Sequence, residues 1–263
     1  MGVPLFQVDA FTHEPFAGNP AAVCLLEQPA PGDWMQSVAA EMNLSETAFV
    51  HRQDGGRYGL RWFTPTVEVD LCGHATLATA HVLFSTGRTD AAVIEFDTRS
   101  GVLRATRRGE LIELDFPTQH VAPAEPEPAL LAALGVAPAA AHAGDGRWLL
   151  ELADEAGVRA VTPDFAGLVP YGIVCITSRA DDAAHDFVSR VFGPAHGIDE
   201  DPVTGSTHCV LSAYWAERLG RTELIGYQAS RRGGVVHVRL AGDRTLLAGH
   251  AVTVLEGELI PPP

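Results

Sequence analysis

Two stretches of this chain share one design, in which an acid opens a small glycine-containing turn and an apolar helical run follows. The first is DLCGHATLATAHVLF at Asp70–Phe84, and the second is DPVTGSTHCVLSA at Asp201–Ala213. Both runs are apolar on nearly every side, which is typical of buried helices. A buried helix needs other elements around it, so two of them favour a chain built as two similar halves.

Short runs of strand type, separated by glycine and proline turns, flank both helical runs. We therefore predict an α+β fold with two pseudo-symmetric halves, each a curled, mainly antiparallel sheet around a central helix. The Ala- and Pro-rich segment at 117–128 contains the expected boundary, which gives halves of residues 1–120 and 121–263. The C-terminal strand is expected either in the second half or crossing back to the first, and a further strand is expected at Gly157–Val161.

Charge and composition exclude several classes of function. The net charge is −15 and the basic residues are scattered, so no basic face is present to bind nucleic acid. No run of 18 apolar residues indicates a membrane span, and the start MGVPLFQVDAF lacks the features of a signal peptide. The four cysteines have no zinc-like spacing, so a reduced, cytoplasmic protein is expected.

The starts of the two helices are candidate anion-binding positions. A helix N-terminus presents unpaired backbone N–H groups and a partial positive charge, which attract a carboxylate. Gly73-His74 and Gly205-Ser206 are the two starts, and glycine lets a ligand approach the backbone closely. The alternative is plain helix capping, for which Asp70, Thr204 and Ser206 are suitable residue types.

Glu46, in the stretch NLSETAFV at Asn43–Val50, begins an expected strand. A carboxylate at a partly apolar rim can act as a general base, because partial burial raises its pKa toward neutrality. The alternative is an ordinary surface glutamate at the start of a strand.

Four ordered motifs resemble those of the PhzF family of phenazine-biosynthesis-like isomerases, which have the diaminopimelate epimerase-like fold. They are VDAFTHEPFAGNPAAVC, MNLSETAFV, LRWFTPTVEVDLCGHATLATAHVL and GIDEDPVTGSTH, and they cover the chain from residue 8 to about residue 215. The resemblance implies two barrel-like halves with the active site in the cleft between them. It also implies a homodimer that uses no cofactor.

By match of motif, the resemblance implies that Glu46 is the acid/base that lifts a proton from carbon and returns it elsewhere. His74, Asp201 and Ser206, with Gly73 and Gly205, would bind a small anionic substrate. The best-known activity of the family is isomerisation of trans-2,3-dihydro-3-hydroxyanthranilate, a small cyclic amino acid. Asn19, in the motif GNP, is placed either near this site or in a turn.

The two turns differ at the residue before the glycine. Racemases and epimerases of the wider superfamily use two opposed thiols, whereas this chain has Cys72 in the first turn and Thr204 in the second. A threonine hydroxyl is too weakly acidic to replace a thiolate at neutral pH, so a single-carboxylate isomerase is favoured.

Two other functions remain open at this stage. One is a thiol-dependent racemase, epimerase or dehydratase that uses Cys72, and the other is a non-catalytic protein that binds a metabolite or partner. No metal is expected, because His74 and His81 lie seven residues apart, about two helical turns.

Overall fold

The computed structural model describes residues 2–259, which form two compact units. Unit 1 comprises residues 2–116 together with 248–259, and unit 2 comprises residues 117–247. The sequence analysis placed the boundary after residue 120 and left the side of the last strand open. Within residues 2–259, no helix has both the length and the apolar character needed to cross a membrane.

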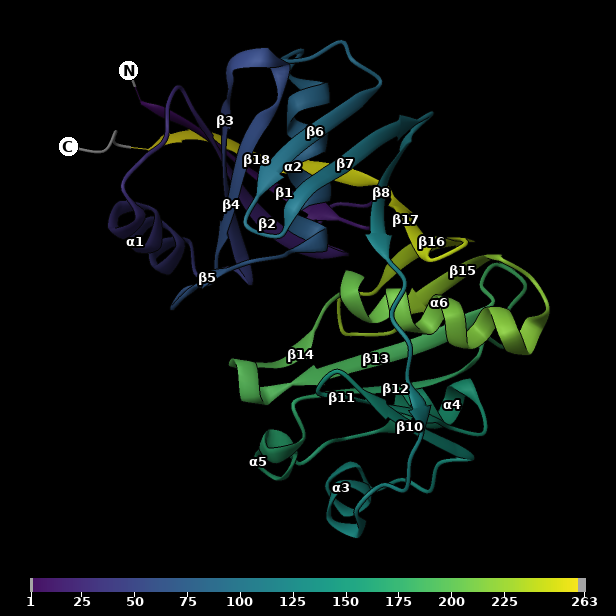
Figure 1. Ribbon diagram of the computed structural model, residues 1–263. Coiled ribbons are helices and arrows are strands. Elements are labelled where there is room, and N and C mark those ends of the chain that lie inside the picture. The colour runs from purple at the N-terminus through teal and green to yellow at the C-terminus, as the bar shows by residue number, and fades with distance from the viewer. Residues whose placement is uncertain (1, 260–263) are drawn as a thin grey trace. The chain divides into compact units, whose positions relative to one another are not determined.

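Unit 1 is a strand-rich body with one helix inside the sheet and one outside it (Figure 1). Strand β1 pairs antiparallel with β2 and with β18, and β2 pairs in parallel with β3, so the last strand belongs to this unit. The elements are β1 (Val3–Ala10), β2 (Asn19–Leu26), α1 (Gly32–Met42), β3 (Glu46–Arg52), β4 (Tyr58–Phe63), β5 (Glu68–Val69), α2 (Gly73–Ser85), β6 (Val93–Thr98), β7 (Gly101–Arg108), β8 (Leu111–Pro117) and β18 (Ala251–Leu259).

The two helices of unit 1 explain why β2 is apolar on both faces. Helix α2 contacts β1, β2, β3, β7 and β18, which surround it. Helix α1 packs on the opposite face of the sheet, where Met35 and Ala39 meet Phe49 and Phe63. A strand covered on both faces is buried almost throughout, and β2 shows that pattern.

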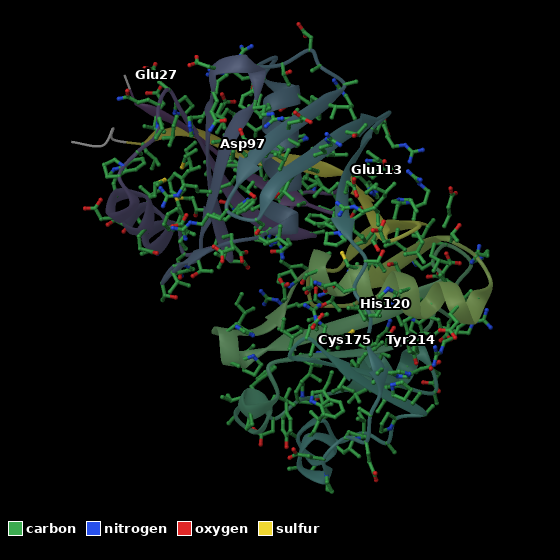
Figure 2. The ribbon with its side chains drawn as sticks, in the orientation of Figure 1. Glu27, Asp97, Glu113, His120, Cys175 and Tyr214 are labelled. Carbon is green, nitrogen blue, oxygen red and sulfur yellow. The ribbon has the colours of Figure 1, made fainter. Side chains whose placement is uncertain are left out.

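Unit 2 repeats this plan with more helices on the outer face. Cys175 and Tyr214, labelled in Figure 2, lie on β12 and α6, which face each other in this unit. The elements are β9 (Ala122–Pro123), α3 (Pro128–Leu134), β10 (Ala140–Gly144), β11 (Arg147–Glu151), α4 (Glu155–Ala160), α5 (Phe165–Leu168), β12 (Ile173–Arg179), β13 (Phe187–Gly193), β14 (Ile198–Asp201), α6 (Gly205–Leu219), β15 (Glu223–Gln228), β16 (Gly234–Ala241) and β17 (Arg244–Gly249).

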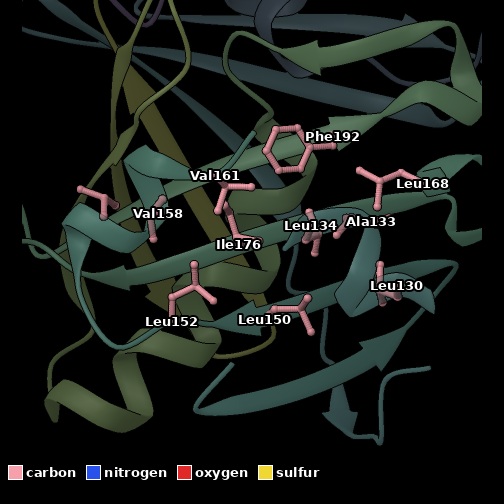
Figure 3. Packing of buried hydrophobic residues seen from close by; sticks show 12 residues of the cluster. Leu130, Ala133, Leu134, Leu150, Leu152, Val158, Val161, Leu168, Ile176 and Phe192 are labelled. Atoms are coloured by element: carbon pink, nitrogen blue, oxygen red, sulfur yellow. The ribbon is translucent and has the colours of Figure 1, made fainter. Parts of the chain in front are cut away.

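The outer core of unit 2 lies between α3, α4 and α5 and one face of β11, β12 and β13 (Figure 3). Leu134, Leu150, Ile176 and Phe192 are fully or almost fully buried there. On the other face, Trp215 of α6 donates a hydrogen bond to Thr177 of β12 at 3.0 Å. The expected central helix of each half is therefore present, as α2 in unit 1 and α6 in unit 2.

The strand expected at Gly157–Val161 was wrong, because residues 157–160 belong to helix α4 and Val161 is its C-cap. The Asp154 side chain is the N-cap and accepts a hydrogen bond from the Gly157 backbone N–H at 2.7 Å. That cap satisfies an otherwise unpaired donor and stabilises the first turn. Val158 then packs into the outer core.

Candidate functional site

Glu46 and His74 come together in unit 1. Nε2 of His74 lies 3.2 Å from Oε2 of Glu46, and the two side chains are 7% and 15% exposed. The distance suits a hydrogen bond, although the ring N–H is not aligned with the carboxylate oxygen. In free enzymes, catalytic hydrogen bonds are often poorly aligned and tighten only when substrate is bound.

The strand pairing brings these two residues together. Glu46 is the first residue of β3 and lies opposite Ala21 in the parallel pairing with β2. His74 is the second residue of α2, which packs against both strands. The carboxylate at the strand start therefore meets the imidazole at the helix start, and the two motifs form one cluster.

Gly18 places a third residue in this cluster. Its backbone has φ +61°, and a Cβ at this position would lie 2.1 Å from the carbonyl oxygen of Ala10. Only glycine fits, and the chain can therefore turn tightly into Asn19 at the start of β2. Asn19 is fully buried, and its Nδ2 lies 3.3 Å from Nδ1 of His74. The sequence left Asn19 between a site role and a turn role, and the structure places it against His74.

These contacts define the protonation of His74. Burial lowers its pKa to about 3, so the ring is neutral at neutral pH. The amide nitrogen of Asn19 can only donate, so Nδ1 accepts and the ring proton is on Nε2, the nitrogen that faces Glu46. Cys72 Sγ lies 3.5 Å from the same Nδ1, where a neutral thiol is a compatible donor.

The triplet of Glu46, Cys72 and His74 has the residue types of a metal site, since one ligand atom from each lies within 4.8 Å of the others. However, Cys72 contacts Nδ1 of His74, whereas Glu46 contacts Nε2. These two nitrogens point to opposite sides of the ring, so one ion cannot replace both contacts. The geometry suits a proton relay better than a metal centre.

In unit 2, Asp201 and Thr204 form the corresponding turn. Thr204 is the N-cap of α6, as Cys72 is the N-cap of α2, so the expected match of these two positions is correct. Oγ1 of Thr204 donates to Oδ2 of Asp201 at 2.6 Å. Gly205 and Ser206 are the first two residues of the helix, and the Ser206 hydroxyl makes no hydrogen bond within residues 2–259.

Gln228, at the end of β15, holds this turn in place and was missed from the sequence. Its Oε1 accepts from the Thr204 backbone N–H at 2.9 Å, and its Nε2 donates to the Asp201 carbonyl at 2.7 Å and to Thr204 Oγ1 at 3.2 Å. The side chain is fully buried. Gln228 shares a strand face with buried Leu224, and this inward polar residue was the available signal.

The other three cysteines are unreactive by environment. Cys24, Cys175 and Cys209 are buried free thiols, as expected from their apolar surroundings. Burial raises the pKa of Cys24 and of Cys209 to about 12. Cys72 is the cysteine that contacts His74, whereas the Cys209 thiol donates to the Gly205 carbonyl at 3.7 Å inside α6.

Comparison with known proteins identifies the family. A family model described as phenazine biosynthesis-like protein matches residues 8–257. An uncharacterized isomerase of Halalkalibacterium halodurans is 48% identical, covering 99% of this chain and 99% of its own.

Solved structures agree with this result. A PhzF family protein of Enterococcus faecalis is 43% identical with a TM-score of 0.95, covering 99% of this chain and all (100%) of its own. A hydroxyproline epimerase of Agrobacterium vitis, 12% identical with a TM-score of 0.61, covers 98% of this chain and 92% of its own and shares the fold alone. The α+β fold of the epimerase type is confirmed, and the chain belongs to the phenazine biosynthesis-like, or PhzF, family.

Proposed function

We propose that this protein is an isomerase that moves a proton within a small carboxylate-bearing substrate, with Glu46 as the single acid/base. The observation that carries this proposal is the 3.2 Å contact between the largely buried Glu46 carboxylate and a neutral His74. The relatives named isomerases support the reaction class. More specifically, we propose that the substrate is of the amino-acid type, such as a cyclic dihydro-hydroxyanthranilate.

In this mechanism, Glu46 removes a proton from a substrate carbon and becomes a carboxylic acid. It then delivers the same proton to another carbon of the substrate, which regenerates the carboxylate. When substrate binds, the Nε2–H of His74 would align with the Glu46 carboxylate oxygen that lies 3.2 Å away and so orient the carboxylate toward the substrate. One base acting on one face gives isomerisation without inversion of a stereocentre.

The cluster of unit 2 is proposed to bind substrate and not to transfer the proton. Asp201 already accepts the Thr204 hydroxyl, and Gln228 fixes the turn, so this carboxylate is held in one orientation. The free Ser206 hydroxyl and the backbone N–H groups at Gly205 would donate to a carboxylate. In unit 1, the backbone N–H groups of Gly73 and His74 would have the corresponding role.

The test is proton exchange in D2O with trans-2,3-dihydro-3-hydroxyanthranilate and related small cyclic amino acids, followed by NMR. We expect wild-type protein to isomerise at least one of them. Glu46→Gln is nearly isosteric but cannot act as a base, so turnover should fall about 1,000-fold or more while binding persists. Turnover by this variant at the wild-type rate would remove Glu46 from the mechanism.

One observation favours a second candidate, a thiol-dependent epimerase or dehydratase. Cys72 Sγ lies 3.5 Å from Nδ1 of His74 at the start of a long helix, a setting that can activate a thiol. However, a thiolate would need a ring proton on Nδ1, and the Asn19 amide opposes that tautomer. Loss of all exchange after alkylation of Cys72 would favour this candidate.

The family resemblance also leads us to propose a cytoplasmic homodimer. Light scattering of the purified protein would measure the dimer directly, and a monomeric mass at micromolar concentration would contradict it.

A purely binding role is the remaining alternative, and absence of exchange with every compound that binds would favour it.

A further inference from the structure

Arg147 is the first residue of β11, where its backbone pairs with β10 and β12. Its side chain makes no hydrogen bond or ion pair within residues 2–259, and its Nε and Nη1 atoms are shielded from solvent. Its Nη2 is the nitrogen that still reaches solvent. Burial lowers the pKa of its guanidinium, and Asp145 acts on its charge only from beyond ion-pair distance. The tip of this cation is therefore partly desolvated and uncompensated.

A comparison with Arg190 shows how unusual this is. Arg190 is also partly buried in unit 2, but its Nε donates to Glu200 at 2.7 Å and its Nη1 to the Val161 carbonyl at 2.6 Å. The chain has 18 basic residues, all arginines, against 33 acidic ones, so carboxylate partners are abundant. A buried charge is normally paired, and an exception needs an explanation.

The strand register places Arg147 on the same face of β11 as Glu151, because residues four apart on a strand share a face. Glu151 accepts hydrogen bonds from Tyr214 at 2.6 Å and Arg218 at 3.2 Å, both in the second half of α6. Figure 2 labels Tyr214 beside Cys175 of the neighbouring strand. Arg147 lies about 13 Å back along β11 from Glu151, toward the start of α6.

The pairing with β12 supports this position, because Arg147 lies opposite Ile173, two residues before Cys175. The Arg147 guanidinium also lowers the pKa of Cys175 on β12 and of Cys209 on α6, against the larger effect of burial. Cys209 is the fifth residue of α6. The guanidinium is therefore partly buried beside the second turn of α6, and burying a charge without a partner costs stability in the free protein.

We propose that Arg147 is a substrate-binding residue that holds the carboxylate of the anionic substrate beside the first two turns of α6. This inference rests on the proposed function and names the group that selects its substrate class. Nη2, the nitrogen that reaches solvent, carries N–H donors that can bind a carboxylate oxygen in a charge-assisted hydrogen bond. The carboxylate of the ligand would supply the negative charge that pairs with the Arg147 guanidinium. This local positive charge would explain how a chain of net charge −15 attracts an anion.

The experiment is calorimetric titration with two probes, anthranilate and its neutral analogue 2-aminobenzamide. Wild-type protein should prefer anthranilate, and Arg147→Gln should weaken anthranilate binding about tenfold or more and abolish the preference. Arg147→Lys keeps the charge but moves it to a more strongly hydrated ammonium of different geometry, and should bind several-fold more weakly than wild type. Arg179→Gln, at an exposed end of β12, is the matched control for the change in charge.

Stability separates a binding role from a structural one. Arg147→Gln should leave the Tm unchanged or raise it, because a partly buried cation without a partner does not stabilise the fold. If Arg147→Gln does not fold, the Arg147 side chain has a structural role. The anthranilate affinity of Arg147→Lys is then the measurement that tests the binding role. Anthranilate binding within about twofold of wild type, in either folded variant, would overturn the inference, as would no wild-type binding at about 10 mM.

The binding experiment distinguishes a failure of this inference from a failure of the catalytic proposal. Glu46→Gln should keep the anthranilate affinity, so a failure of Arg147 to matter leaves the role of Glu46 intact. Conversely, unchanged turnover in Glu46→Gln would remove the base but leave a carboxylate-binding Arg147 standing.

Discussion

The starts of α2 and α6 have the same backbone plan and different chemistry. Each follows a short strand and a turn, has an N-cap residue whose side chain makes no capping hydrogen bond, and begins with glycine. In unit 1 the neighbours are Asn19 and Glu46, which bracket a neutral imidazole. In unit 2 they are Gln228 and Thr204, which fix the Asp201 turn.

The difference fits the proposed function, in which unit 1 would transfer the proton and unit 2 would bind the substrate. The contacts in unit 1 set the position of a proton, which is what acid/base chemistry requires. The contacts in unit 2 fix hydrogen-bonding groups in place and leave the side chains of Arg147 and Ser206 without partners in the described part of the chain, residues 2–259. The first arrangement suits proton transfer, and the second suits recognition of an anion.

Asn19→Asp tests the proton position in unit 1 and should have the largest effect. An aspartate presents only acceptors to Nδ1 of His74, which forces the ring proton onto Nδ1 and removes it from the nitrogen facing Glu46. We expect kcat to fall about 100-fold. Asn19→Ser retains a donor and should recover part of this loss, and 15N NMR of His74 should report the change of tautomer. An unchanged tautomer in Asn19→Asp would contradict the relay.

Gln228→Leu tests the fixed turn of unit 2. It removes three hydrogen bonds and leaves the Thr204 N–H unsatisfied in a buried place, so the free energy of unfolding should fall by about 2–3 kcal/mol. KM should rise more than kcat falls. Gln36→Leu in unit 1 loses one hydrogen bond, to the Thr64 carbonyl, and should cost about 1 kcal/mol or less. Urea unfolding measures both, and equal losses would refute the special role of Gln228.

Lowering the pH should destabilise the folded protein through one buried histidine in each unit. Burial lowers the pKa of His74 to about 3 and of His208 to about 4, below the unfolded value of about 6.5. As the pH falls below 6.5, the unfolded chain binds protons that the folded chain cannot, so each histidine removes about 1.4 kcal/mol of stability per pH unit.

His208 is the better test, because it lies outside the proposed catalytic cluster. Its Nδ1 donates to the Thr204 carbonyl at 2.9 Å, and its buried Nε2 has no partner within residues 2–259. Between pH 7 and pH 5, His208→Gln should lose about 2 kcal/mol less than wild type in urea titrations. The same loss in both proteins would show that His208 is protonated in the folded state.

Cys72→Ser should have the smallest effect on activity if the carboxylate is the acid/base. Serine keeps a donor toward Nδ1 of His74, so turnover should change by about threefold or less. A loss of about 100-fold or more would instead support the thiol-dependent alternative.

Local sequence patterns predicted the elements that contain most residues of the candidate site. The glycine turns and the apolar runs predicted α2 and α6, and the motif around Glu46 predicted a carboxylate at a strand start. The helix at α4 was missed because the cap at Asp154 outweighed a short apolar run of strand type. Local patterns therefore worked where one element decides the geometry.

The remaining contacts depend on strand register, which no local pattern reveals. Gln228 contacts a residue 24 positions earlier, and Asn19 contacts one 55 positions later. Arg147 is recognisable only by the absence of a partner, which requires knowledge of every neighbour. For buried polar residues in strands, the sequence indicates that a partner must exist without naming it.

The most direct test of this division is isomerisation at saturating substrate by Glu46→Gln and Asp201→Asn, measured side by side. The account predicts that Glu46→Gln binds normally and turns over about 1,000-fold more slowly or not at all. Asp201→Asn should bind more weakly but keep kcat within about tenfold of wild type. The reverse result, with the proton transfer lost in Asp201→Asn and retained in Glu46→Gln, would contradict it.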